Sequence, residues 1–196
     1  MQLEKIQQHW QNYYNMSDNK LKLVLLSCCA PCSAGAIRQL ANGLIPNVSD
    51  FIVLFYNPNI FPESEYTKRM IEQIKYCESI GAKYAVLEYD HDAWRTAVQG
   101  LETEPERGAR CSVCFAYRFQ RAVQFACENG YNAIGSVLGV SRHKNQTQVD
   151  EAAESVCGDI TYTPIKWDEN LRVQINRESD FYRQNYCGCE FSIRKV

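Results

Sequence analysis

Short apolar runs alternate along this chain with longer segments in which apolar residues recur every three to four positions. Runs bounded by turn residues are typical of buried strands, and the longer period is typical of helices that pack against them. The pattern predicts five strands, at 22–27, 51–56, 84–89, 133–138 and 160–165. Because strand and helix alternate, the sequence indicates an α/β fold with a doubly wound, mostly parallel, Rossmann-like (HUP-like) sheet of about five strands.

Helices are predicted between these strands. The first begins at Ser33, which we interpret as its N-cap, and ends near Gly43, whereas Gly81 ends the second. The expected ranges are 33–43, 63–80, 92–101, 111–129 and 145–157. No repeat or linker-like tract divides the 196 residues. We therefore expect a single α/β domain over 1–196, with an N-terminal extension at 1–20 and a C-terminal segment at 177–196 that carries a Cys-Gly-Cys pair.

Composition and charge narrow the classes of function. The net charge of −2 excludes the overall basic surface that a general nucleic-acid coat protein needs, and leaves room only for a local basic patch. No apolar stretch approaches the roughly 18 to 20 residues that span a bilayer, and the N-terminus has no signal-peptide core. We therefore expect a cytoplasmic protein without membrane contact. In that compartment disulfides are rare, and paired cysteines more often bind metal or take part in catalysis.

Seven of the ten cysteines fall in three tight clusters. The clusters are Cys28, Cys29 and Cys32; Cys111 and Cys114; and Cys187 and Cys189. The first follows the first predicted strand, and in an open parallel sheet the site forms outside the carboxyl ends of the strands. We therefore expect a cysteine-rich metal site at this edge. The remaining three, Cys77, Cys127 and Cys157, lie on or beside apolar helical stripes and are expected to be buried.

Two kinds of metal site are compatible with these clusters. Zinc could take two knuckle-like pairs, Cys29 with Cys32 and Cys111 with Cys114, but the pairs are farther apart in sequence than in a compact zinc module. An iron-sulfur cluster could take Cys28, Cys29, Cys111 and Cys114, because a loop after a strand can turn adjacent cysteines toward one cluster. Composition alone favours the iron-sulfur site only modestly.

The third cluster, Cys187-Gly188-Cys189, indicates redox chemistry. A disulfide across one intervening residue closes a small, strained ring, and strain makes the bond easier to reduce. Glycine at the centre relieves the demand on the backbone. The pair is therefore a candidate two-electron store, or else a further pair of metal ligands. Motifs for dinucleotide binding and for P-loop nucleotide binding do not occur in the sequence.

Five motifs follow one another with specific spacing over nearly the whole chain. They are Cys-Cys-Ala-Pro-Cys at 28–32; Tyr-Asn-Pro-Asn-Ile at 56–60 followed by Glu65, Tyr66 and Arg69; Arg110-Cys-x-x-Cys with Arg118; Ser141-Arg-His-Lys-Asn145; and Tyr186-Cys-Gly-Cys189. In this combination the chain resembles the QueH-type epoxyqueuosine reductases, from about residue 23 to residue 192.

The resemblance implies a tRNA-modifying enzyme that reduces epoxyqueuosine to queuosine at the wobble position of the anticodon, the last step of queuosine biosynthesis. It implies a [4Fe-4S] cluster on Cys28, Cys29, Cys111 and Cys114, and a redox-active pair at Cys187 and Cys189. An additional iron beside the cluster is also implied, with Cys32 the first candidate ligand. The sequence does not identify the electron donor.

A tRNA substrate gives a role to the basic residues near the cysteines. The wobble base must be unstacked to reach the site, so we expect phosphate contacts around its mouth. The candidates are Arg110, Arg118, Arg142 and Lys144, together with the arginines near the C-terminus. Two alternatives to the reductase stay open: a zinc-stabilised RNA-binding module without catalysis, and a thiol-disulfide reductase that acts through Cys187 and Cys189.

Overall fold

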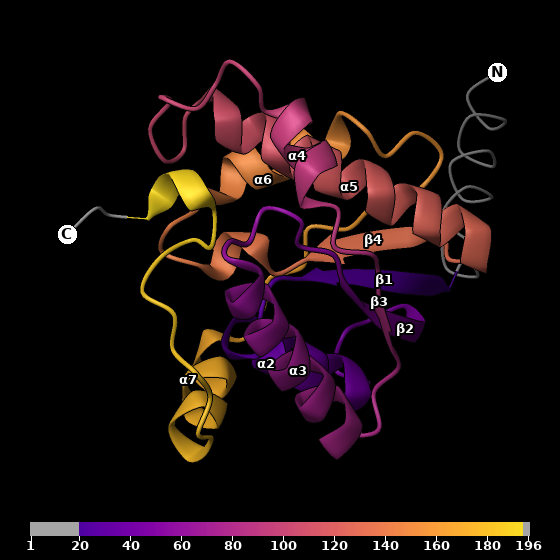
Figure 1. Cartoon of the computed structure of the whole chain (residues 1–196). Coiled ribbons are helices and arrows are strands. Elements are labelled where there is room, and N and C mark those ends of the chain that lie inside the picture. The colour runs from indigo at the N-terminus through magenta and orange to yellow at the C-terminus, as the bar shows by residue number, and fades with distance from the viewer. Residues whose placement is uncertain (1–19, 194–196) are drawn as a thin grey trace, which may run out of the picture.

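A computed structural model describes residues 20–193 and contains a five-stranded sheet (Figure 1). The strands are β1 (Leu21–Ser27), β2 (Val48–Phe55), β3 (Tyr84–Val86), β4 (Ala133–Ser136) and β5 (Thr161–Tyr162). All neighbouring strands are parallel, in the order β3-β2-β1-β4-β5. The predicted doubly wound sheet is confirmed. The predicted N-terminal extension lies outside the described residues, apart from Lys20.

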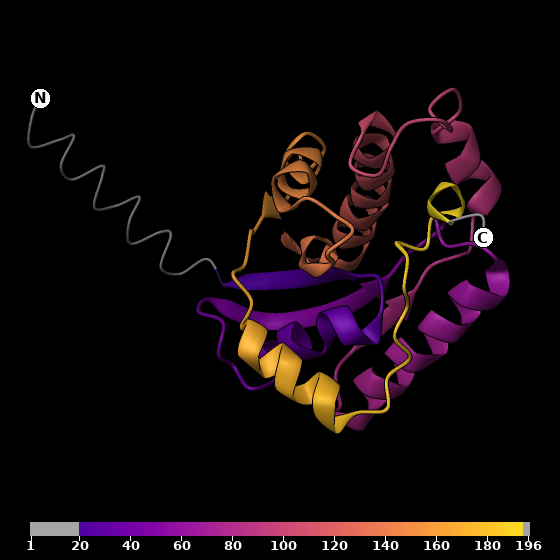
Figure 2. The same cartoon turned by 90° about the vertical axis from the view of Figure 1, so that its left-hand side faces the viewer.

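Helices cover both faces of the sheet (Figures 1 and 2). One face carries α2 (Ala30–Ala41), α3 (Glu63–Ser79) and α7 (Glu169–Glu178), and the other carries α5 (Ala109–Asn129) and α6 (Gln146–Glu154). Helix α4 (His91–Ala97) packs against α5, and two short 3-10 helices, η1 (Leu138–Val140) and η2 (Glu190–Ser192), follow β4 and the Cys-Gly-Cys turn. From α7 the C-terminal segment crosses the end of the sheet to η2 (Figure 2).

Strand β1 lies at the centre of the sheet and is buried on both faces. The side chains of residues 23–26 alternate between the two helical layers, and all four are fully buried. A continuous apolar run is what a parallel strand between two helical layers requires. Because β1 ends at Ser27, the next residue, Cys28, emerges at the middle of the carboxyl edge, where the chain order of the strands reverses.

The N-cap of helix α2 lies four residues earlier than predicted. Ala30 is its first residue, Cys29 is the N-cap, and Ser33 lies in the first turn, where its hydroxyl donates to the Cys29 carbonyl oxygen at 3.0 Å. Pro31 is compatible with this start, because a proline in the first turn has no N–H to leave unsatisfied. The early start places Cys32 on the first helical turn instead of in a loop.

Candidate metal and redox site

Three thiols gather where β1 ends and α2 begins. The Sγ atoms of Cys28, Cys29 and Cys32 lie within 4.8 Å of one another, and those of Cys28 and Cys29 are 3.8 Å apart. Cys28 follows the strand, Cys29 is an extended N-cap and Cys32 stands in the first helical turn, so the change from strand to helix brings the three together. Within residues 20–193, no other three cysteine, histidine or acidic side chains are spaced so closely. Soft sulfur ligands at this spacing suit a thiophilic metal.

The three thiols share a negative charge that centres on Cys28. Hydrogen bonds with Cys29 and Cys32 lower the pKa of Cys28 well below its usual range, and the same contacts raise the pKa of Cys29 and raise the pKa of Cys32 to about 12. The Lys144 ammonium lies 3.6 Å from Cys28 Sγ. Burial is the largest single influence on Lys144 and lowers its pKa, but the charges of Cys28, Cys187 and Cys32 together outweigh burial and raise the pKa. Lys144 therefore stays charged beside the Cys28 thiolate.

The second cysteine cluster lies at the start of α5, on the other face of the sheet. Cys111 packs against the same apolar cluster as Cys28, whereas Cys114 packs with Trp94 and Cys189. Burial raises the pKa of Cys111 and raises the pKa of Cys114 to about 11. Both sulfurs stand outside the group of three thiols, so the four-cysteine ligand set stays a prediction.

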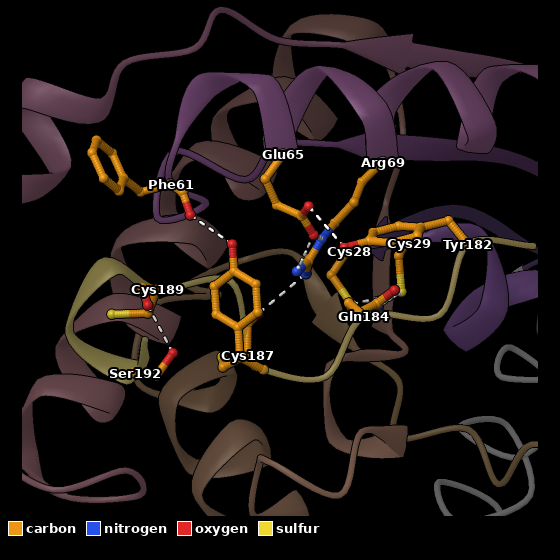
Figure 3. A network of polar contacts seen from close by, with 11 residues as sticks. Cys28, Cys29, Phe61, Glu65, Arg69, Tyr182, Gln184, Cys187, Cys189 and Ser192 are labelled. Carbon is orange, nitrogen blue, oxygen red and sulfur yellow. Dashed lines mark hydrogen bonds and ion pairs between the residues drawn. The ribbon is translucent and has the colours of Figure 1, made fainter. Parts of the chain in front are cut away.

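The C-terminal segment brings the third cysteine cluster to the same edge (Figure 3). Gln184 donates from Nε2 to Cys29 Sγ at 2.7 Å. Cys187 is half-buried, and its charge adds to the pKa rise that burial causes in the two α5 cysteines. Cys189 is buried against Cys114. All three cysteine clusters therefore lie at the carboxyl edge of the sheet.

Three of the four candidates for phosphate contact near the cysteines are buried. Arg118 is 1% exposed and donates to the carbonyl oxygen and the amide side chain of the 56–57 turn, which fixes this turn against α5. Arg110 is 2% exposed and donates to carbonyl oxygens of the loop before α5. Lys144 is buried beside the thiols, whereas Arg142 is exposed. Of the four, only Arg142 has the exposure that a direct phosphate contact requires.

An open cavity of about 410 Å³ lies beside Cys32. Four arginines stand in its wall: Arg142, Arg172, Arg177 and Arg183. Three other lining residues each have a buried polar atom without a hydrogen-bond partner among the described residues: His143 Nε2, Asn176 Oδ1 and Gln184 Oε1. Such atoms are costly to leave unpaired, so a polar ligand or ordered water in the cavity would satisfy them. A second cavity, of about 450 Å³, shares His143.

Sequence reasoning does not find Asn176 or Gln184. Isolated amides have no characteristic spacing, and both residues reach the cavity only because α7 and the C-terminal segment fold back over the end of the sheet. The one usable signal is that Gln184 lies three residues before Cys187.

The fold and the site define an α/β protein with a thiol-rich metal site at the carboxyl edge of a parallel sheet. The family model described as Epoxyqueuosine reductase QueH matches residues 23–195. The protein named Epoxyqueuosine reductase QueH from Acinetobacter baylyi is 40% identical, over 91% of this chain and 84% of the relative. The protein of the same name from Haemophilus influenzae is 38% identical, over 91% of this chain and 74% of the relative. The chain belongs to the QueH family of epoxyqueuosine reductases.

A solved structure supports the fold. The U34-tRNA thiolase NcsA from Methanococcus maripaludis, determined with its [4Fe-4S] cluster, is similar with a TM-score of 0.58 over 92% of this chain and 64% of that chain. At 16% identity this likeness concerns the fold alone. In the part of the chain that the structure describes, no helix combines the length and the apolar character needed to cross a membrane.

Proposed function

We propose that this chain reduces the epoxide of epoxyqueuosine to the alkene of queuosine, at the wobble position of a tRNA anticodon, as the last step of queuosine biosynthesis. One observation carries the proposal. Three cysteine clusters from separate segments lie at one edge of the sheet, in a member of the QueH family. A zinc-stabilised binding module would not require the additional thiol pair at Cys187 and Cys189. A general thiol-disulfide reductase would not require the group of three thiols at the start of α2.

The thiols fit an iron-sulfur cofactor, because thiolates are the usual ligands of such clusters. A [4Fe-4S] cluster would be held by Cys28, Cys29, Cys111 and Cys114. Cys32, the third sulfur of the close group, would serve an additional iron. Lys144 would offset part of the negative charge that thiolate ligands bring together. When bound, the cluster supplies electrons one at a time.

The thiols of Cys187 and Cys189 match the electron demand of the reaction. Conversion of an epoxide to an alkene breaks two C–O bonds, takes up two electrons and two protons, and releases water. Oxidation of two thiols breaks two S–H bonds, forms an S–S bond, and yields two electrons and two protons. The two half-reactions therefore balance, and an external reductant returns the disulfide to the dithiol.

The cavity beside Cys32 suits the unstacked nucleotide. Asn176 Oδ1 and Gln184 Oε1 can accept hydrogen bonds from hydroxyl or amine groups of the modified base, and His143 can donate or accept one. The arginines in the cavity wall, Arg142, Arg172, Arg177 and Arg183, can contact the flanking phosphates. Arg142 and the arginines near the C-terminus thus keep the role expected from the sequence, whereas the buried Arg110 and Arg118 do not.

Reaction of the anaerobically purified protein, supplied with an excess of a chemical reductant, with an anticodon stem-loop that carries epoxyqueuosine tests the proposal. Mass spectrometry of the released nucleoside should show loss of one oxygen atom, and the protein should absorb near ~400 nm. Cys189→Ser is expected to keep this band and to lose multiple turnover. Normal multiple turnover in that variant would exclude the redox role of the pair. A colourless protein that contains zinc and converts nothing would favour the binding module.

A further inference from the structure

The backbone of the turn 187–189 is fixed by the segments around it (Figure 3). The Phe61 N–H donates to the central carbonyl oxygen of the turn at 2.8 Å, and Ile60 forms an antiparallel bridge with Cys189. The Ser192 N–H and hydroxyl both donate to the Cys189 carbonyl oxygen, at 2.9 and 2.7 Å. The turn is therefore held through its carbonyl groups, independently of its two sulfur atoms.

A buried arginine closes the remaining side of the turn. Arg69 of α3 is 1% exposed, and its Nη1 donates to the Cys187 carbonyl oxygen at 3.3 Å. Glu65, one helical turn earlier, accepts from Arg69 Nε at 2.7 Å and lies 2.7 Å from Nη2. Figure 3 shows the guanidinium between the Glu65 carboxylate and the turn. Both short contacts reach the same carboxylate oxygen, Oε1, so the buried guanidinium is held between Glu65 on one side and the Cys187 carbonyl oxygen on the other.

Gly188 allows the arginine to come this close. Its φ is +106°, and a Cβ atom there would lie 3.0 Å from Arg69 Nη1 and 3.0 Å from Ile60 Cγ1. Any other residue would be strained in its backbone and crowded by these neighbours. The absence of a side chain at Gly188 therefore permits the close approach of Arg69, and it also suits the small ring that a disulfide would form.

Two tyrosines of the C-terminal segment complete the contact with α3. Tyr182 donates to Glu65 Oε2 at 3.1 Å, so both carboxylate oxygens of Glu65 have partners. Tyr186 donates to the Phe61 carbonyl oxygen at 2.6 Å, and its ring centroid lies 5.3 Å from the Arg69 guanidinium carbon. The ion pair, the tyrosines and the turn thus form one connected unit.

We propose that Arg69, oriented by Glu65, is a positioning residue that sets the reduction potential of the Cys187 and Cys189 pair. The inference rests on the proposed function, in which this pair cycles between dithiol and disulfide. Both thiols are free in the structure, so the contacts to the turn belong to the dithiol form. A disulfide across one residue imposes a strained ring on the backbone. Contacts that hold the relaxed backbone therefore favour the dithiol and raise the potential.

The potential can be measured on one peptide. Trypsin cleavage after Arg183 and Arg194 releases residues 184–194, which contain Cys187 and Cys189 and no other cysteine. The cluster-loaded protein is equilibrated anaerobically with glutathione buffers and alkylated, and the two forms of this peptide are quantified by mass spectrometry. On oxidation the pair gives two protons and two electrons to glutathione disulfide, whose S–S bond breaks to give two thiols.

Arg69→Gln should make the pair easier to oxidise. We expect the equilibrium constant for oxidation by glutathione disulfide to rise about tenfold, which corresponds to a potential about 30 mV lower. Arg69→Lys should recover only part of the difference, because an ammonium keeps the charge but not the planar geometry. Lys75→Gln is the matched control: it removes the same charge from an exposed position of α3 and should leave the constant unchanged.

An Arg69→Gln protein with the wild-type constant would overturn the inference and leave the proposed function intact. If circular dichroism shows that this variant does not fold, Glu65→Gln, which weakens the same ion pair, carries the same expectation and the same outcome that overturns it. A wild-type peptide that stays reduced across the whole buffer series would overturn both the redox role of the pair and the inference. The wild-type titration therefore separates the two failures.

Discussion

Two cysteines away from the carboxyl edge, Cys77 and Cys157, are buried, and burial raises the pKa of each thiol to about 11. Their burial agrees with the apolar stripes in the sequence. For Cys127 the same prediction is wrong, because this side chain is exposed. It directly follows the fully buried Ala126, and one residue along a helix turns the side chain by about 100°. The apolar period does not show whether a residue at the edge of the stripe is buried, because its burial depends on how α5 is rotated about its axis against the sheet.

These environments predict the order in which the thiols are alkylated. At about pH 8, iodoacetamide should modify Cys127 well before Cys77 or Cys157, because the thiolate is the reactive form and burial keeps the latter two protonated. Their modification should increase as the pH rises toward about 11, where the thiolate forms. Peptide mass spectrometry gives the rates. Modification of Cys157 ahead of Cys127 at the lower pH would contradict the assigned burial.

Single substitutions of the edge cysteines test the proposed ligand set. Cys28→Ala and Cys111→Ala should each abolish the ~400 nm band and lower iron and acid-labile sulfide together. Cys32→Ala should keep the sulfide and lose only the additional iron. Cys127→Ala, at an exposed position of α5, is the control and should keep both. Full iron and sulfide in Cys111→Ala would remove this residue from the ligand set.

At the scale of elements, helix α7 shows where sequence patterns stop being informative. Its apolar residues Leu171 and Ile175 share one face at a four-residue spacing, but Val173 lies off this face and only Ile175 is buried, so the apolar stripe is too short to detect. The available signal is Asp168, the N-cap, whose carboxylate accepts two backbone N–H groups of the first turn. Helix α3, by contrast, is predicted almost to its last residue, because its period of 3.6 is regular and Gly81 follows it.

The packing of α7 on α2 predicts that adding a single methyl group to α2 at Gly35 destabilises the folded protein. A Cβ atom at Gly35 of α2 would lie 2.9 Å from Arg172 Cα. Gly35→Ala should therefore lower the free energy of unfolding by about 1–2 kcal/mol, since overpacking outweighs the gain in helix propensity. Urea denaturation measures this, with the exposed Gln120→Ala as control. An increase in the free energy of unfolding of Gly35→Ala would contradict this prediction, because it would mean that α7 can move away from α2 without loss of stability.

At the scale of the whole molecule, the parallel sheet collects chemistry from segments far apart in sequence. Because the carboxyl ends of parallel strands share one edge, the sequence predicts where the site lies. It does not predict which basic residues are exposed, since the burial of Arg118 follows from a tertiary contact between α5 and the turn after β2. The cavity beside Cys32 has walls from four separate segments, so no local pattern encodes it.

The position of this cavity predicts where the tRNA binds. Arg142 and Arg177 are exposed in its wall, so replacing both with Gln should weaken binding of an epoxyqueuosine stem-loop. Each lost phosphate contact should lower the slope of log K against log salt concentration by about 0.7 to 0.9. Lys20→Gln with Lys22→Gln removes equal charge at the opposite end of β1 and should change neither quantity. Fluorescence anisotropy across a salt series measures both, and a wild-type slope in the arginine variant would place the RNA elsewhere on the molecule.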